Sequence, residues 1–365
     1  MTPDIRPVAA VAEIDNRDRV RQLGTVPALY GVRGVAVLLV VGRHYNTILP
    51  GGGLGVDLFF VLSGFLITSL LLGEHGRTGR ISLGWFYWRR ALRLLPALLA
   101  LIAVYVSFTV WKGGFADDTH GLRNALWSLS YLSNFPLAAG MDGGSLSHLW
   151  SLAQEEQFYL LWPPLLTGLL ALRFRPRPIV GALLVVAGLF AAHRWSIADT
   201  GTLRRLWVAP DMHADALIAG CAAGFVYCFR LWCRWLQPAG LVALAACVAV
   251  VATEARENRS LFGWPLAVFV VAAAVAVLAV ADSPRSPLAR LLSFRPLQLL
   301  GVISYGLYLW HFPIFKVAGA TPLALVFSVV VAAASYRYLE SPVLRLRQTR
   351  VMPQRRSAAA AEGVG

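Results

Sequence analysis

Apolar stretches of about 20 residues alternate with short polar connections along nearly the whole chain. A hydrocarbon layer about 30 Å thick needs roughly 20 apolar residues in a helix, so each stretch is long enough to cross a bilayer. The sequence therefore predicts an all-α fold, a polytopic helical bundle of about ten transmembrane helices. We place these at Val26–His44, Leu54–Leu72, Leu92–Trp111, Leu149–Leu172, Ile179–Arg194, His213–Phe229, Gly240–Thr253, Leu261–Ala281, Leu297–Phe315 and Thr321–Leu339.

Basic residues gather in every second connection, which fixes an expected orientation. The basic connections lie around residues 77–93, 173–177, 230–234, 285–295 and 345–356. Because such loops face the cytoplasm, both termini are expected there, in a multi-pass protein of the plasma membrane such as a bacterial inner membrane. We divide the chain into a cytoplasmic segment at residues 1–24, a membrane domain at 25–342 and a basic, disordered cytoplasmic tail at 343–365. The longer connection Lys112–His148 includes a semi-apolar piece around Trp127–Phe135 that is either re-entrant, packed on the membrane face or an additional span.

Composition excludes several other classes of protein. Of the 365 residues, 57% are hydrophobic and only 14% are charged, which is not the composition of a soluble domain. The net charge of +14 comes from arginines in short loops between spans, not from one basic face, so nucleic acid is not an expected partner. The four cysteines show no metal-like spacing and predict no metal site.

The first apolar stretch contains two polar residues whose burial in lipid would be energetically unfavourable. Arg33 and His44 are eleven positions apart, which places them about 20° from one helix face and roughly 16 Å apart along the axis. Burying an arginine in lipid costs about 2.5 to 3.5 kcal/mol even on lenient scales, so this face is expected to line a cavity inside the protein. A structural ion pair for Arg33 and an interfacial position for His44 are the alternative.

Further polar residues open the second and fourth spans. Asp57 follows a glycine turn after His44 and could orient its imidazole by a hydrogen bond, although an ordinary helix cap fits equally well. His148, Glu155 and Tyr159 share one face of the fourth span, and Glu156 lies about 100° from Glu155. We expect at least one of the two glutamates to be protonated or paired with a buried base such as Arg33.

Two other segments carry candidate chemistry. Arg89, Arg90 and Arg93 cluster at the start of the third span, where they form either an ordinary interfacial helix or a phosphate site, because guanidinium groups suit phosphate. The ninth span contains a polar stripe of Ser304, Tyr305, Tyr308 and His311. For polar residues at the ends of the sixth and tenth spans, structural ion pairs or caps are favoured; these are Asp211, His213, Asp215, Tyr336 and Glu340.

Taken together, these motifs resemble the membrane acyltransferase-3 family, the O-antigen and macrolide O-acyltransferase type. The resemblance runs from about Tyr30 to Pro342 and rests on ordered motifs: Arg33 and His44 spaced as R-x10-H, then GVDLFFVLSGF, RRALRLLP, HLWSLAQEEQFYLLWP, SYGLYLWHFP and YLESP. There are two departures. Where many members read Arg-x-Asp before the sixth span, this chain has His213-Ala214-Asp215, and no esterase-like domain is expected after the last span.

The resemblance implies a ten-span enzyme that moves an acyl group, commonly acetyl, from acyl-CoA to a hydroxyl of a carbohydrate, glycolipid or macrolide acceptor. It implies Arg33, His44, Asp57 and Glu155 as catalytic residues and a basic run at Arg89, Arg90 and Arg93, which we interpret as the acyl-CoA site. His44 would act as general base or as nucleophile, oriented by Asp57 or Glu155, with Arg33 holding an anionic group or supporting the oxyanion.

The remaining polar residues of the fourth and ninth spans are expected to line the cavity or to contact the acceptor: His148, Ser151, Glu156, Tyr159, Ser304, Tyr305, Tyr308 and His311. No bound cofactor is expected, and acyl-CoA enters as a donor substrate. The other class of function is a secondary transporter with a buried relay of His, Glu and Arg, for which such residues are equally typical. The sequence leaves open the acceptor and the oligomeric state.

Overall fold

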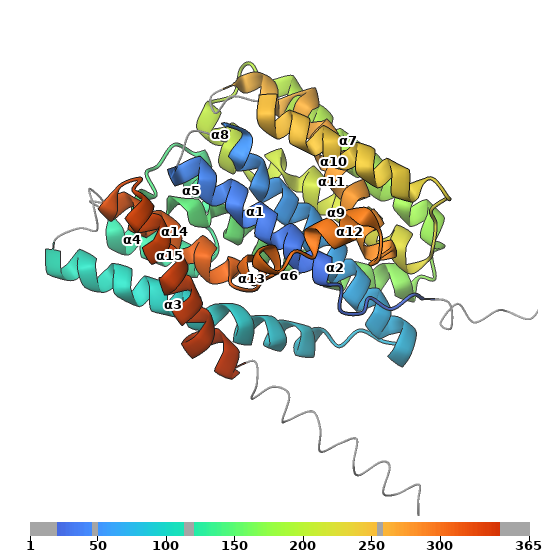
Figure 1. The fold of residues 1–365 in the computed structure, drawn as a ribbon, viewed down its shortest axis with the longest axis horizontal. Coiled ribbons are helices and arrows are strands. Elements are labelled where there is room, and N and C mark those ends of the chain that lie inside the picture. The colour runs from blue at the N-terminus through green and yellow to red at the C-terminus, as the bar shows by residue number, and fades with distance from the viewer. Residues whose placement is uncertain (1–19, 46–49, 113–119, 254–257, 344–365) are drawn as a thin grey trace, which may run out of the picture.

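The computed structural model describes residues 20–45, 50–112, 120–253 and 258–343, and within them it contains helices and no strand (Figure 1). The all-helical class is therefore confirmed. The α-helices are α1 Pro27–Tyr45, α2 Leu54–Thr78, α3 Leu83–Lys112, α4 Gly121–Leu129, α5 Asn134–Ala138, α6 Trp150–Ala171, α7 Pro176–Ile197, α8 Leu203–Val208, α9 Ala214–Cys228, α10 Leu236–Thr253, α11 Trp264–Asp282, α12 Pro287–Leu292, α13 Arg295–Val302, α14 Ser304–Ala318 and α15 Pro322–Ser335. Shorter 3-10 turns include η3 (Gly144–Leu149), and the π-helix η6 (Tyr336–Glu340) follows α15. The sequence segment 1–19 and the tail 344–365 lie outside the described residues.

Among the described residues, six helical segments are long and apolar enough to cross a membrane: Gly51–Thr78, Leu83–Trp111, Pro176–Ile197, Leu236–Thr253, Trp264–Asp282 and Pro322–Val343. The pair α13 and α14, bent by 72° at a short break, makes a seventh if it is one span. The helix α9 is shorter, and α1 and α6 carry charged residues that lower their mean hydropathy. The count of about ten and the cytoplasmic termini stay predictions.

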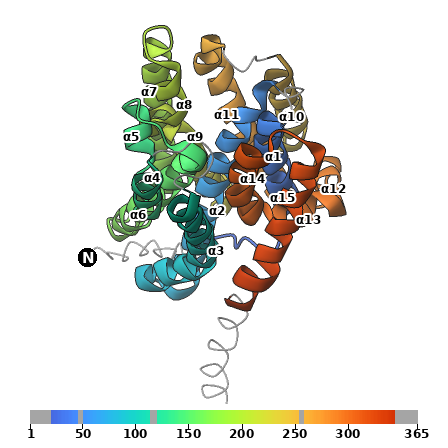
Figure 2. The ribbon, with the colours of Figure 1, turned by 90° about the vertical axis from the view of Figure 1, so that its left-hand side faces the viewer.

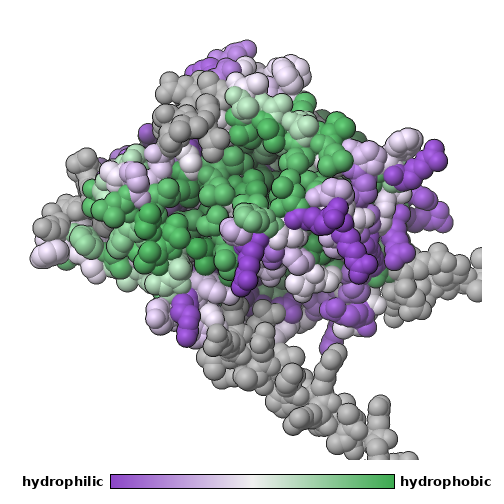
Figure 3. Space-filling model, in the orientation of Figure 1, coloured by the Kyte–Doolittle hydropathy of each residue, from purple (hydrophilic) through white to green (hydrophobic). Residues whose placement is uncertain are grey.

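The outer surface fits a lipid environment. Figure 3 shows hydrophobic residues covering a broad central area of one face, with hydrophilic residues toward its edges. On α7, Leu184, Val185 and Leu189 expose more than half of their surface. A surface of this kind is expected of a protein that faces hydrocarbon.

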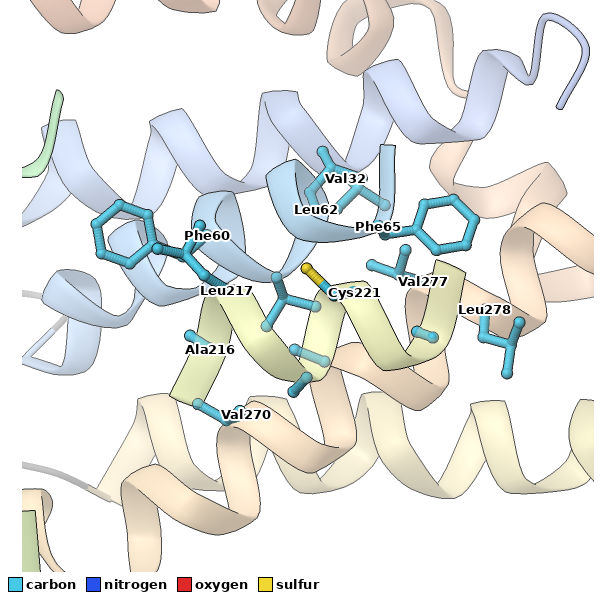
Figure 4. Close-up of a cluster of buried hydrophobic side chains, with 14 of the residues drawn as sticks. Val32, Phe60, Leu62, Phe65, Ala216, Leu217, Cys221, Val270, Val277 and Leu278 are labelled. Carbon is cyan, nitrogen blue, oxygen red and sulfur yellow. The ribbon is translucent and has the colours of Figure 1, made fainter. Parts of the chain in front are cut away.

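The core forms where α2 crosses α9, with α1 and α11 packed beside them. Figure 4 shows Leu62 and Phe65 of α2 facing Leu217 and Cys221 of α9. The approach is close because Gly220 presents no side chain: a Cβ atom there would collide with the carbonyl oxygen of Val61. Small residues at such crossings bring helix backbones together, which is how membrane helices gain packing contacts.

The segment Trp127–Phe135 is not a span. It is divided between the nine-residue α4 and the five-residue α5, and at 1.5 Å per residue neither can cross about 30 Å of hydrocarbon. In Figure 2, α4–α7 lie on one side of the molecule and α12–α15 on the other, with α2 between them. The turn η3 and the helices α6 and α14 contribute the polar residues that α1 faces.

Candidate functional site

Arg33 on α1 is held at the break between α13 and α14. Its Nη2 donates a hydrogen bond of 2.9 Å to the hydroxyl of Ser304, and its Nε lies 3.4 Å from the carbonyl oxygen of Gly301. The 72° bend exposes that carbonyl group and brings Ser304 to the first turn of α14. The guanidinium group is therefore positioned by neutral oxygens, which leaves its charge available to a ligand.

Arg33 forms part of the wall of a small cavity of about 50 Å³, which we call the inner cavity. Its lining joins α1, α2, α6 and α14 and consists of Arg33, Val56, Phe59, Phe60, Ser151, Leu152, Glu155, Ser304, Tyr305 and Tyr308. Five polar residues expected from the sequence to line a cavity or act in it are thus found around Arg33. The inner cavity is large enough for small groups only, such as water or the end of an acyl chain.

The two adjacent glutamates of α6 have different partners. Glu155 accepts hydrogen bonds from the hydroxyls of Ser63 and Tyr159, and it faces the inner cavity. Glu156 forms an ion pair of 2.7 Å with Arg90. The expected pairing of one glutamate with a base is therefore found, but the base is Arg90 and not Arg33. Tyr159 lies under the Arg90 guanidinium, 3.2 Å from the ring centroid, and not in the cavity wall.

His44 lies at the other end of α1, in a wider cavity of about 500 Å³, which we call the outer cavity. Ligand sites in proteins commonly enclose about 300 to 1,000 Å³, so this cavity has room for a sugar unit or a similar molecule. Its lining comprises Val40, Arg43, His44, Gly53, Val56, Leu137, Asp142, Gly144, Ser147, His148, Trp150, Leu203, Arg204, Trp207, Val208, Tyr308, Phe312 and Lys316.

Tyr308 and Val56 belong to the walls of both cavities. The Tyr308 hydroxyl donates a hydrogen bond to the backbone carbonyl of His148 and lies 2.7 Å from the hydroxyl of Ser151. It is therefore fixed between α14 and the start of α6. The two ends of α1 thus lead into neighbouring spaces that are separated by the side chains of these two residues.

Three imidazole rings meet beside the outer cavity. The ring centroids of His44 and His311 are 5.3 Å apart, and those of His148 and His311 are 5.5 Å apart. Phe312 contacts both His44 and His148, at 4.8 and 5.0 Å. In the part of the chain that the structure describes, no group of three His, Cys, Asp or Glu residues has a geometry that could hold a metal ion.

The hydrogen bonds define how His148 is protonated. Its Nε2 lies 3.2 Å from the carbonyl oxygen of Leu309, which can only accept, so Nε2 carries the proton. The buried Nδ1 has no hydrogen-bond partner among the residues that the structure describes. His148 lies in η3, before the first residue of α6, and its burial beside His311 and His44 lowers the pKa of its imidazole well below 6.5. A neutral ring with a bare nitrogen can accept a hydrogen bond from a bound hydroxyl group.

Asp57 is not brought to His44. Its Oδ1 accepts a 2.7 Å hydrogen bond from Nδ1 of His213 on the neighbouring α9, and its buried Oδ2 has no hydrogen-bond partner. The other ring nitrogen of His213 lies 3.1 Å from the carbonyl oxygen of Trp207. Both ring nitrogens of His213 therefore face oxygen atoms, which fixes the orientation of the ring. The close crossing of α2 and α9 explains why Asp57 pairs with His213.

The neighbouring polar residues form structural ion pairs, as the sequence favoured. Asp215 pairs at 2.7 Å with Arg194 of α7, a side chain that is fully buried. Asp211 accepts from Arg205 at 2.6 Å. In this chain the position where many family members carry an arginine is therefore filled by His213, and Arg194 of α7 pairs with Asp215 from another helix.

The three arginines at the start of α3 differ in their surroundings. Arg89 lies 3.6 Å from Glu74, and Arg90 is paired with Glu156. Arg93 is exposed and, within the described residues, it forms no ion pair. Of the three, Arg93 is thus the side chain that remains open to a phosphate from outside the protein.

Several residues of the outer cavity were missed as site residues by sequence reasoning. The Arg43 guanidinium stacks on Trp207 at 3.9 Å, and Arg204 donates from Nη1 to the carbonyl oxygens of Gly140 and Met141 at 2.9 Å each. Lys316 lies with its Nζ 5.6 Å from the ring centroid of Phe312. In the sequence, Arg204 and Lys316 contributed only to the loop charges; the one available signal was the position of Arg43 directly before His44.

A single family model, described as an acyltransferase domain, matches residues 26–335. The chain therefore belongs to this acyltransferase family, and the resemblance seen in the sequence is confirmed. It is 34% identical over 352 residues to the O-acetyltransferase OatA of Staphylococcus aureus (strain NCTC 8325 / PS 47), an alignment that covers 87% of this chain and 57% of the relative.

A second relative is the peptidoglycan O-acetyltransferase OatA of Listeria monocytogenes serovar 1/2a (strain ATCC BAA-679 / EGD-e), at 32% identity over 350 residues. That alignment covers 87% of this chain and 56% of the relative. The chain thus spans little more than half the length of these curated relatives. No solved structure is significantly similar to it.

Proposed function

We propose that the protein transfers an acetyl group from acyl-CoA to a hydroxyl group of a carbohydrate bound in the outer cavity. The observation that carries this proposal is the arrangement of one helix with Arg33 in the inner cavity and His44 in the outer cavity, separated by Tyr308 and Val56. Family membership favours this reaction over secondary transport. The carbohydrate acceptor is supported by the name of the Listeria relative, a peptidoglycan O-acetyltransferase.

The donor enters, in this proposal, from the cytoplasmic end of α3. Arg93 binds a phosphate of the donor, because among Arg89, Arg90 and Arg93 it is the exposed one and guanidinium forks suit phosphate oxygens. The acyl-bearing arm then passes Arg33 and reaches Tyr308. The axial distance of about 16 Å between Arg33 and His44 suits an extended arm rather than direct contact of one small group with both residues.

Transfer requires that the acceptor hydroxyl loses its proton as its oxygen attacks the acyl carbon. His44 takes this proton, the carbon–oxygen bond forms and the carbon–sulfur bond breaks, and the proton then passes to the departing thiolate. In the alternative order, the His44 nitrogen attacks the acyl carbon, the carbon–sulfur bond breaks and the thiolate leaves. The acceptor oxygen then attacks the acyl carbon, the carbon–nitrogen bond breaks, and the hydroxyl proton neutralises the thiolate. His148, which lines the outer cavity, orients the acceptor toward His44.

Arg33 supports the reaction by its charge. Neutral oxygens from Ser304 and Gly301 hold it, and among the described residues no carboxylate accepts a hydrogen bond from it, although Glu155 lines the same cavity. Its guanidinium group donates a hydrogen bond to an amide carbonyl oxygen of the uncharged acyl-bearing arm. Asp57, paired with His213, acts by holding the start of α2 in position beside both cavities.

The test uses the full chain, purified and reconstituted in lipid nanodiscs, with acetyl-CoA and a mixture of cell-wall oligosaccharides. We expect acceptor-dependent release of free thiol together with O-acetyl esters on the sugars, detected by mass spectrometry. Uptake of a solute into vesicles without thiol release would favour a transporter and contradict the proposal.

A further inference from the structure

The outer cavity carries an excess of positive charge that acetyl transfer to a neutral hydroxyl does not require. Three basic side chains, Arg43, Arg204 and Lys316, line it together with one carboxylate, that of Asp142. Without counting the histidines, the described lining residues carry a net charge of +2. A cleft with a charge excess of one sign concentrates ligands of the opposite sign.

Among the described residues, Arg204 and Lys316 contact neutral groups, and Arg43 contacts an aromatic ring. Arg43 stacks on Trp207, Arg204 binds two backbone carbonyl groups, and Lys316 lies over Phe312. Within the described part of the chain, neither Arg204 nor Lys316 forms an ion pair, and Asp142 Oδ1 accepts instead from the backbone N–H of Gly144. On the donor side, by contrast, Arg89 and Arg90 are each opposed by a glutamate.

The basic groups also surround the reacting residue. Arg43 directly precedes His44 on α1. The ring centroids of Phe312 and His44 are 4.8 Å apart, and the Nζ of Lys316 also lies over the Phe312 ring. Arg204 is contributed by α8 on a different part of the wall. A ligand whose hydroxyl group reaches His44 would therefore place its remaining substituents among these three cations.

From this arrangement we infer that the acceptor is an acidic carbohydrate, one that carries a carboxylate or phosphate close to the hydroxyl group that is acylated. Arg204 and Lys316 bind the anionic group, and Arg43 extends the same positive wall toward His44. This inference rests on the proposed function and adds the substrate class to it. Charge-assisted hydrogen bonds of this kind are stronger than neutral ones, so the site binds an acidic sugar more tightly than a neutral sugar.

The experiment measures equilibrium binding to the full chain in nanodiscs of phosphatidylcholine, a lipid without net charge. The probes are trigalacturonate and neutral galactotriose, which differ by their carboxylates, and glucose 1-phosphate against glucose to compare phosphate with carboxylate. We expect the acidic member of at least one pair to bind about tenfold more tightly, with a preference that shrinks as salt is added.

Matched variants assign the preference to the named residues. The double variant Arg204→Gln, Lys316→Gln should lose it, whereas the charge-conserving Arg204→Lys, Lys316→Arg pair should keep it and shows that the cavity is still folded. Arg290→Gln, an exposed arginine on α12 outside both cavities, is the control and should bind like the parent protein.

Equal binding of acidic and neutral sugars, or no measurable binding of any of them, would overturn the inference. So would a preference that survives the double glutamine variant. A third probe, adenosine 3′,5′-bisphosphate, represents the phosphates of CoA: if the double variant weakens its binding and not that of the sugars, the cations serve the donor. Because these assays need no turnover, acetyl transfer that persists alongside any of these results leaves the proposed function standing.

Discussion

The hydroxyl of Tyr308 donates a hydrogen bond to the backbone carbonyl of His148, and this contact ties α14 to the turn before α6 where the two cavities meet. The same hydroxyl lies 2.7 Å from Ser151. Tyr308 lies in the walls of both the inner cavity, at Arg33, and the outer cavity, at His44. Its side chain is held there by its hydroxyl contacts with His148 and Ser151.

Replacing Tyr308 by phenylalanine should slow acyl transfer while the protein still folds. The ring continues to separate the two cavities, but the carbonyl of His148 and the hydroxyl of Ser151 lose a partner, a loss of about 1 to 3 kcal/mol for buried groups. We expect thiol release from acetyl-CoA to fall at least several-fold. Tyr338→Phe, at an exposed position on η6, is the control; equal activity of the two variants would contradict the role given to Tyr308.

The Asp57–His213 pair should be important for stability. His213→Ala leaves the Asp57 carboxylate buried without a partner, and breaking a buried pair from one side commonly costs about 3 to 5 kcal/mol. We expect a clear drop in melting temperature in detergent, and a smaller drop for the double variant Asp57→Asn, His213→Gln. His193→Ala removes a histidine from an exposed ion pair and should have little effect. A His213→Ala protein as stable as that control would refute this assignment.

Substitutions of Arg90 and Arg93 on α3 should affect different properties, stability in one case and donor binding in the other. Arg90→Gln leaves Glu156 without its base and should lower stability, whereas exposed Arg93→Gln should leave stability unchanged and raise the KM for acetyl-CoA several-fold. Thermal melting and steady-state kinetics measure the two effects separately. An unchanged KM in Arg93→Gln would remove this residue from the donor site.

The crossing of α2 and α9 should not tolerate a side chain at Gly220. A Cβ atom there meets the backbone of Val61, and overpacking a core costs about 1 to 3 kcal/mol or more. Gly220→Val should therefore reduce the yield of folded protein. Gly188→Val on α7, where no atom lies within 4 Å of the added Cβ, is the control and should accumulate normally.

The helical fold was predictable because apolar stretches in a membrane must satisfy their backbone hydrogen bonds internally. The polar residues of α1 and α6 were equally visible, since charges in such stretches have to face protein. The hydrogen-bond partners of these polar residues could not be predicted. Asp57 and His213, for example, are 156 positions apart, and the packing of α2 on α9 decides their contact. In the sequence, Arg204 and Lys316 cannot be told apart from other loop charges. Only the packing of α8 and α14 places them in the wall of the outer cavity, with His44.

The central claim is that His44 reacts with the acyl group or with the acceptor's proton. Its most direct test compares thiol release and O-acetyl ester formation by the parent protein and by His44→Gln, both as full chains in nanodiscs. His193→Gln, an exposed histidine on α7, is the matched control. The account predicts that His44→Gln folds and accumulates normally but transfers no acetyl group, while His193→Gln is fully active. Full activity in His44→Gln would contradict it.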